Sequence, residues 1–235
     1  MTDVRPATRK GVSSFPLGVP RPGRASTGAY PRVELVYQYL PFDRTCEQWL
    51  HTKVEEDWIR EIEAKRAFFQ TFWDGEAPAL LGTTVSETGM RFRRREMMAV
   101  LTLGTTISMS TPLIVSVRRF LDGPTQGKPL PMHQFSALMF HELLHSYIPY
   151  PLPGSMMMEK YNGESPMVLT HLHLMGLLKH VYLKLRRDDQ LEEIIAKDSA
   201  AEDPIYRRAW KIVNEIESHQ AFVDEIKTYS RSLSK

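Results

Sequence analysis

A five-residue motif near the middle of the chain constrains its fold more than any other feature. Residues 141–145 read His-Glu-Leu-Leu-His, and the apolar spacing around them predicts a helix over residues 131–148 that a following proline ends. Side chains four residues apart lie on one face of a helix, about 6 Å apart along its axis, so His141 and His145 can bind one metal ion. Glu142 projects about 100° away, where it can take a proton from a water held by that ion.

The motif also has a plainer interpretation, as two core histidines bonded to backbone carbonyls beside an exposed glutamate. A chain with this content of His and Glu contains such a motif by chance in roughly one case in fifty. Phe140, Leu143 and Leu144, however, surround the polar side chains. Burying two imidazoles and a carboxylate there without a common ligand would leave polar groups unpaired, so we expect a metal site.

The rest of the chain predicts an α+β fold, in which a small, mainly antiparallel sheet precedes the motif helix and a helical C-terminal half. Residues 1–31, rich in proline, glycine and serine, indicate a flexible lead-in, and residues 32–235 are expected to form a single domain. Strands are predicted at 33–40, 98–103, 105–109 and 113–117. Further helices are predicted from Asp43 or Thr45 to about Trp73, where Asp74-Gly75 ends the helix, and at 167–185, 190–197 and 204–229, with a short helix or loop at 76–89 that Gly89 closes.

Composition and charge narrow the classes of partner. Hydrophobic residues make up 42% of the chain, enough for a core, and the net charge of +2 gives no general attraction to nucleic acids or anionic membranes. The arginines of residues 91–95 flank Phe92 as on the solvent face of a strand, without an aromatic platform. No apolar run approaches the roughly 18–20 residues of a membrane span. We therefore expect neither a nucleic-acid partner nor a membrane span.

Localisation is left open by the sequence. Cys46 is the single cysteine, so an internal disulfide is impossible. Met1–Lys10 lacks the apolar core of a signal peptide. The chain is therefore either cytoplasmic or exported with its signal removed.

With its motif behind a small sheet and ahead of a helical half, the chain resembles the zincin metallopeptidases over roughly residues 95–185. The resemblance implies zinc held by His141, His145 and a third, downstream ligand, with Glu142 as general base. The residues after the motif lack the glycine and third histidine of the metzincin continuation. Residues 162–164 contain an extra glycine relative to the thermolysin-like Asn-Glu pair, so the subfamily stays unassigned.

A hydrolytic zinc site needs three protein ligands and one open position. Four downstream residues are candidates for the third ligand: Glu159, Glu164, His171 and His173. On a helical wheel of residues 167–185, His171 shares the continuous apolar sector with Leu174 and Leu178, whereas His173 shares a wetter sector with His180. A ligand must reach inward to meet the motif helix, so we choose His171, with Glu164 as the alternative.

These roles predict a zinc-dependent hydrolase, most simply a metallopeptidase that acts on a peptide or protein substrate. The candidates for oxyanion stabilisation are Tyr147, Tyr161, His180 and Tyr182, of which Tyr182 shares the sector of His171. The substrate is expected to pair with an edge strand, either 105–109 or 113–117. Two other classes stay open: a metal-dependent hydrolase of a small non-peptide amide, and a non-catalytic zincin-like protein that interacts through its helical half.

Overall fold

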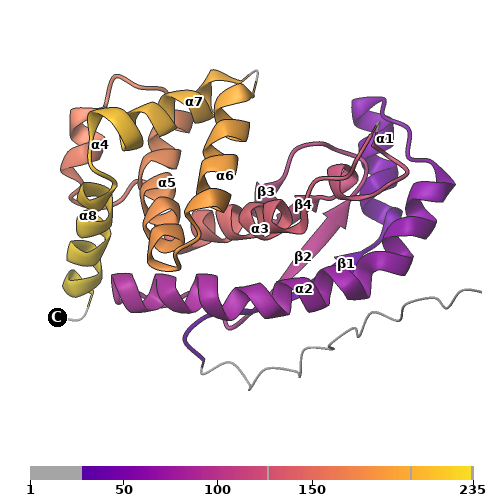
Figure 1. The fold of residues 1–235 in the computed structure, drawn as a ribbon, viewed down its shortest axis with the longest axis horizontal. Helices are drawn as coiled ribbons and strands as arrows, with labels where there is room; N and C mark the ends of the chain where they lie inside the picture. Colours follow the sequence, from indigo (N-terminus) through magenta and orange to yellow (C-terminus); the bar gives the residue numbers. More distant parts are fainter. Residues whose placement is uncertain (1–27, 126, 202, 234–235) are drawn as a thin grey trace, which may run out of the picture.

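The computed structural model describes residues 28–125, 127–201 and 203–233, so the predicted lead-in lies largely outside the described residues. Within them, a small four-stranded sheet packs beside eight α-helices, which confirms the α+β class (Figure 1). The strands are β1 (Arg32–Tyr37), β2 (Glu96–Thr102), β3 (Met109–Ser110) and β4 (Leu113–Ser116). The helices are α1 (Arg44–Leu50), α2 (Glu56–Thr88), α3 (Met132–Tyr147), α4 (Met156–Lys160), α5 (Pro166–Lys184), α6 (Asp188–Ala200), α7 (Pro204–Lys211) and α8 (His219–Ser232).

The sheet is mixed, in the order β1-β2-β4-β3. β1 pairs with β2 and β2 with β4 in parallel, while β3 runs antiparallel to β4. The prediction of a mainly antiparallel sheet is therefore wrong. α2 lies on the connection between β1 and β2, and such a crossover makes those two strands parallel. β4 then pairs with β2 as well as with β3, so the β3–β4 pair is the one antiparallel pair of the described sheet. The strand predicted at 105–109 shortens to Met109–Ser110, at the edge of the sheet.

The first predicted helix is divided differently from the prediction. α1 ends at His51, whose φ of 52° is left-handed, and α2 starts five residues later. α2 then continues through Asp74-Gly75, which we expected to end it, and through Pro78. Trp73 and Leu80 are buried on either side of these residues. Core packing along α2 thus outweighs the helix-breaking preference of the glycine and the proline.

Two helix termini follow the rules of capping. Gly89, with φ of 73°, donates its N–H to the Val85 carbonyl at 2.9 Å and ends α2, so the predicted closure at this glycine is confirmed. Ser165 begins α5, because its hydroxyl accepts the Val168 N–H at 3.2 Å. These ends fix the length of the two helices that flank the motif helix.

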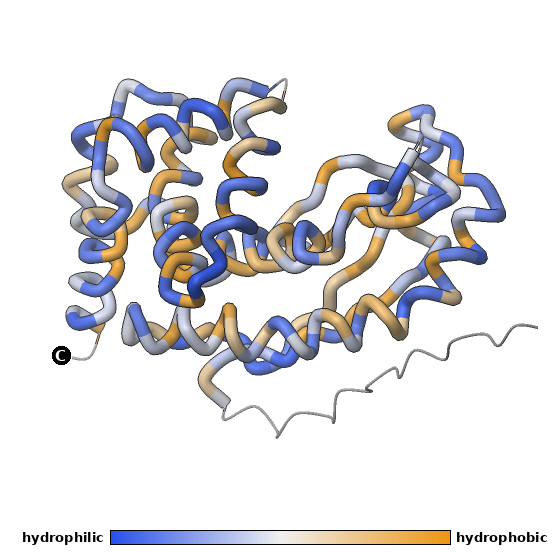
Figure 2. Tube along the Cα trace, viewed as in Figure 1, coloured by the Kyte–Doolittle hydropathy of each residue, from blue (hydrophilic) through white to orange (hydrophobic). Residues whose placement is uncertain are grey.

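The core forms where α2, the sheet and α3 meet. Phe69 of α2 lies edge-on to Phe135 of α3, with ring centroids 4.9 Å apart, and Phe120 contacts Phe135 from the other side at 5.7 Å. Figure 2 shows hydrophobic residues along β2, with hydrophobic and hydrophilic residues alternating along α2. This packing anchors the beginning of α3, and with it the direction of the motif helix.

The C-terminal half is helical, as predicted. α5 matches the predicted helix, but the helix predicted at 204–229 is two helices, α7 and α8, separated by a wider turn at Ile212–Ile216. α8 packs closely on α5, since a Cβ added to Gly176 would lie 2.8 Å from the Cβ of Phe222. In Figure 1, α2 runs beneath both the sheet and α5. Within the described residues, no helix combines the length and apolar character needed to cross a bilayer.

Candidate metal centre

Helix α3 places two imidazoles side by side. It ends at Tyr147, one residue before the predicted end, and the extended Ile148, whose N–H donates to the Leu144 carbonyl, leads into the proline. His141 and His145 lie one turn apart on the same face, and their Nε2 atoms are 3.2 Å apart. Two imidazole nitrogens that bind one tetrahedral zinc at about 2.0–2.1 Å lie roughly 3.3 Å from each other. The pair therefore has nearly the spacing that zinc requires.

His171 joins this pair from α5. Its ring centroid lies 5.3 Å from that of His141 and 4.9 Å from that of His145. One ligand atom from each of the three residues lies within 4.8 Å of the other two. The structure thus brings together the three residues that the sequence singled out, and the cluster they form, the histidine triad, can hold a metal ion.

The hydrogen bonding of His171 leaves one ring nitrogen free for a ligand. Its Nδ1 lies 2.6 Å from the Met167 carbonyl oxygen, so Nδ1 carries the proton and Nε2 carries the lone pair. Nε2 is buried and has no hydrogen-bond partner among the described residues. A carbonyl bonded to the far nitrogen is the usual support of a metal-binding histidine. The donor set therefore fits a zinc ion.

Burial keeps the histidine triad neutral. It holds the pKa of His141 well below the usual value, with further lowering from the charges of His171 and His145. Burial likewise lowers the pKa of His145 to about 4, and it lowers the pKa of His171 against a smaller opposing effect of the Met167 carbonyl. Neutral imidazoles are the form that binds metals, so the triad is ready to bind at neutral pH.

Glu142 lies next to the histidine triad with its carboxylate largely removed from solvent. Its exposed fraction is 6%, and burial raises its pKa to about 7. No side chain in the described part of the chain forms a hydrogen bond with it. A carboxyl group with a pKa near neutrality can both accept and release a proton at neutral pH, which is the property of a general base and acid.

Tyr206, on α7, completes the surroundings of the triad and was missed by the sequence reasoning. Its ring centroid lies 4.9 Å from that of His171 and 5.8 Å from that of His141. Burial, and then the charge of Glu142, raises its pKa to about 12, so the phenol stays protonated. No local pattern marks this tyrosine, because its place depends on how α7 packs against α5.

The other candidates for the third ligand are engaged elsewhere or exposed. Glu164 accepts a hydrogen bond from the Arg208 Nε at 2.9 Å, and Glu159 is exposed on α4. His173 Nε2 lies 2.8 Å from a Glu225 carboxylate oxygen.

The prediction that His173 and His180 lie on a wetter face is wrong. Both side chains are buried, with exposed fractions of 3% and 5%. His180 pairs with Glu87 at 2.8 Å, as His173 pairs with Glu225. The helical wheel assigned these positions correctly to a polar sector, but glutamates from α2 and α8 cover that sector and replace the solvent.

The residues first considered for oxyanion stabilisation lie away from the histidine triad or are already bonded. Tyr147 donates to the Met90 carbonyl at 3.0 Å, and Tyr161 to Glu217 at 2.5 Å. Tyr182 shares a helix face with His171, but eleven residues separate them, about 16 Å along the axis. Its ring instead packs near that of Phe140. Tyr206 is the tyrosine that contacts the triad.

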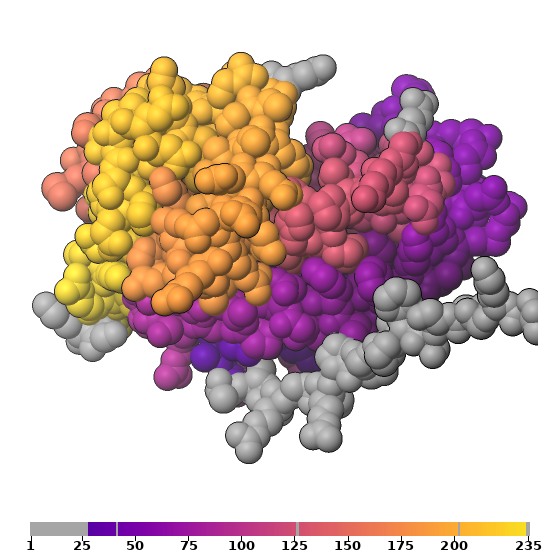
Figure 3. Space-filling view, in the orientation of Figure 1, coloured from indigo at the N-terminus to yellow at the C-terminus, as the bar shows by residue number. Residues whose placement is uncertain are grey.

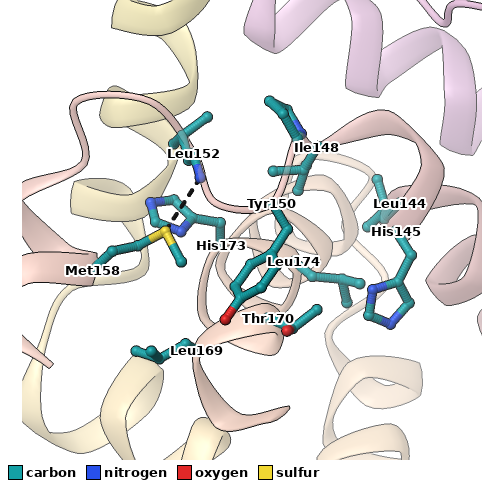
Figure 4. Close-up of a pocket in the computed structure, with 11 residues that line it drawn as sticks. Leu144, His145, Ile148, Tyr150, Leu152, Met158, Leu169, Thr170, His173 and Leu174 are labelled. Carbon is teal, nitrogen blue, oxygen red and sulfur yellow. Dashed lines mark hydrogen bonds between the residues drawn. The ribbon is translucent and has the colours of Figure 1, made fainter. Parts of the chain in front are cut away.

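A narrow cavity opens beside His145, away from Tyr206. It measures ≈ 30 Å³, room for about two waters. Figure 4 shows His145 on one side of it and His173 on the other, with Tyr150 and Leu174 between them.

Comparison with known proteins identifies no relative: no family model, no curated protein and no solved structure matches the chain. The chemistry of the site therefore has to be derived from its own residues.

Proposed function

We propose that the protein is a zinc-dependent hydrolase, and specifically a metallopeptidase of the zincin type. The observation that carries the proposal is the buried, unpartnered Nε2 of His171, which lies with the two motif histidines of α3. A buried imidazole nitrogen without a partner is unfavourable, and a shared zinc ion would satisfy all three at once. The position of the motif helix, between the sheet and the helical half, adds support through the resemblance to zincins.

Bound zinc would lower the pKa of a water molecule and polarise the carbonyl of the substrate. Glu142 accepts the proton of the attacking water and then delivers it to the leaving amine, roles that suit its pKa of about 7. The protonated phenol of Tyr206 donates a hydrogen bond to the oxygen on which negative charge develops. His141, His145 and His171 would hold the zinc ion.

Of the two strands considered for pairing with the substrate, β3 and β4, only β3 lies at an edge of the described sheet. β4 has neighbours on both sides, β2 and β3, so its backbone groups are already paired. β3 lies at the edge and contacts α3. We therefore propose that an extended peptide adds to the sheet beside Met109–Ser110 and passes from there to the histidine triad.

The test of this proposal combines metal content with hydrolysis. Protein purified with zinc should contain one ion per chain, and it should cleave members of an internally quenched peptide library. Glu142→Gln should abolish cleavage and retain zinc, whereas Glu159→Gln, at an exposed position on α4, should leave both unchanged.

Three results would decide against parts of the proposal. A chain that holds no stoichiometric zinc would rule out both enzyme interpretations and favour an interaction protein. Zinc lost with Glu142→Gln would make Glu142 a ligand rather than the base. Zinc binding without cleavage of any peptide, but with cleavage of small amides, would replace the peptidase by an amidohydrolase.

A further inference from the structure

A second concavity lies beyond the end of β4. Its volume is ≈ 350 Å³, and it is lined by the side chains of Arg118, Arg119 and Lys128 together with the hydroxyl-bearing Thr106 and Thr125. We call these five residues the basic pocket. Its volume is within the range of about 300–1,000 Å³ that is usual for ligand sites. Among the described residues that line the basic pocket, none is acidic.

The three cations of the basic pocket have no counter-charge. Arg118, Arg119 and Lys128 form no ion pair with any residue that the structure describes. Asp122 of the neighbouring loop is already paired with Lys65, at 2.8 Å, and Glu61 of α2 is engaged as well. Glu61 accepts the Asp122 N–H at 2.7 Å and the Lys65 ammonium at 2.6 Å. Like charges gathered without a counter-ion repel one another, and a bound anion would remove that repulsion.

The walls of the basic pocket are held in place before any ligand binds. The Arg118 guanidinium lies over the Trp58 ring, 5.2 Å from its centroid. The Arg119 carbonyl accepts the Leu130 N–H at 2.8 Å, which joins the two sides of the following loop. Two arginines on a fixed backbone offer the planar donor groups that match carboxylates.

The basic pocket adjoins the segment that leads into the edge strand β3. Thr106 belongs to the segment that leads into the edge strand β3, and the Ser116 hydroxyl ties this segment to β4 by donating to the Thr105 carbonyl at 2.7 Å. Burial lowers the pKa of Lys197 on α6, with a further lowering by the charge of Arg119, and the charge of Lys197 adds to the lowering of the His141 pKa that burial causes. In Figure 3 the surface is notched between the orange helices α6 and α7 and the pink segment that contains β3 and β4.

We propose that the basic pocket binds a carboxylate of the peptide substrate, so that the enzyme selects acidic peptides or peptide C-termini. The assignment of the carboxylate to a substrate peptide rests on the proposed peptidase function, whereas anion binding by the pocket does not. A carboxylate held by Arg119 and Lys128 would fix one end of a peptide whose backbone pairs with β3. The basic pocket would then determine which bond of the peptide lies at the triad.

Binding of labelled peptides tests this proposal independently of catalysis. Fluorescence anisotropy would compare fluorescein-labelled hexaglutamate amide, hexaglutamine amide and hexaglutamine with a free C-terminus, on the zinc-loaded protein at about 50 mM salt. At least one carboxylate-bearing peptide should bind about tenfold more tightly than hexaglutamine amide. Tighter binding of hexaglutamate amide identifies side-chain carboxylates as the ligand, and tighter binding of the free acid identifies the C-terminus.

Two double variants that each remove two positive charges distinguish binding in the basic pocket from general electrostatic attraction. Arg119→Gln/Lys128→Gln should abolish the preference for carboxylates. Arg93→Gln/Arg94→Gln removes two exposed charges just before the start of β2, whereas the basic pocket lies beyond the end of β4. This variant should preserve the preference for carboxylates. Equal loss in both double variants, the same affinity for all three peptides, or equally tight binding of a labelled hexauridylate would overturn the proposal. Carboxylate binding without hydrolysis would instead refute the peptidase and leave the pocket in place.

Discussion

Replacing Glu142 by glutamine should stabilise the metal-free protein, and the gain should grow with pH. Burial raises the pKa of this carboxyl from 4.5 to about 7 in the folded chain. The folded state therefore holds the proton more tightly than the unfolded state does. The stability that this proton contributes is complete below pH 4.5 and is lost as the pH rises through 7. Glutamine cannot lose a proton, so the variant escapes this loss.

The size of the effect follows from the two pKa values. They differ by 7 − 4.5 = 2.5 units, and one unit corresponds to about 1.4 kcal/mol, so the full effect is about 3.4 kcal/mol. Some of the loss has occurred by pH 5, which leaves about 2.5 kcal/mol between pH 5 and pH 8. The titration of the histidine triad also changes stability with pH, but it is common to both proteins and largely cancels in their difference.

Urea denaturation in the presence of a chelator measures this difference. The free energy of unfolding of Glu142→Gln minus that of the unsubstituted protein should increase by about 2.5 kcal/mol from pH 5 to pH 8. Glu159→Gln, at an exposed position, should show no such increase. A difference for Glu142→Gln that stays constant within about 0.5 kcal/mol would refute the reasoning, because it would show that the carboxyl titrates alike in both states.

Further predictions concern the ligands, the phenol and the packing of the helical half. His171→Ala should weaken zinc binding by more than about 100-fold in a competition titration, whereas Glu164→Gln should leave it unchanged. Because the imidazole pKa values are lowered, that of His145 to about 4, zinc affinity should decline with acid only below about pH 5, not near 6.5. Tyr206→Phe should lower kcat about 100-fold with little change in KM or zinc content. Gly176→Ala should destabilise the fold by about 1–3 kcal/mol in urea denaturation without loss of zinc stoichiometry, since its Cβ would meet Phe222 at 2.8 Å.

The parts of the site that were predictable from sequence lie on single helices. The relation of His141 to His145 depends only on helical geometry, and the boundaries of α3 depend on nearby prolines. The inward direction of His171 followed from the apolar sector of α5, which the structure also buries. Each of these inferences uses information from within one helix, where 3.6 residues per turn fix which side chains share a face.

The sheet was harder to predict because strand direction depends on the connections between strands. Gly75 and Pro78 suggested that the chain changes course, whereas α2 runs through both and returns the chain for a parallel pairing. Local helix propensity is a weak guide in a helix with one buried face. The burial of a few core side chains there stabilises the helix by more free energy than one proline costs. The prediction of antiparallel strands rested on the short turns between residues 98 and 117, but only the turn between β3 and β4 produces an antiparallel pair, because β4 also pairs in parallel with β2.

Tyr206 and the glutamate partner of His173 show a second limit of prediction from the sequence. Each position depends on contacts between helices that are distant in sequence: α7 brings the tyrosine to the histidine triad, and α8 brings Glu225 to His173. A helical wheel reports the polarity of a face but not what covers it. For that reason a sector that looked exposed is buried against carboxylates.

Helix α5 itself contains the comparison that distinguishes a ligand from a core histidine. It carries three buried histidines, and two of them, His173 and His180, each have a glutamate within 2.8 Å. Nothing in the described chain offers such a partner to the Nε2 of His171, although that nitrogen is buried as well. Because Nε2 of His171 carries the lone pair, it needs a hydrogen-bond donor or a cation, and leaving it unsatisfied costs about 1–3 kcal/mol. The fold surrounds His171 with two further imidazoles and a tyrosine, none of which donates a hydrogen bond to its Nε2. A cation shared by the three imidazoles would accept this lone pair, so a metal site explains the buried Nε2 of His171 better than a purely structural role does.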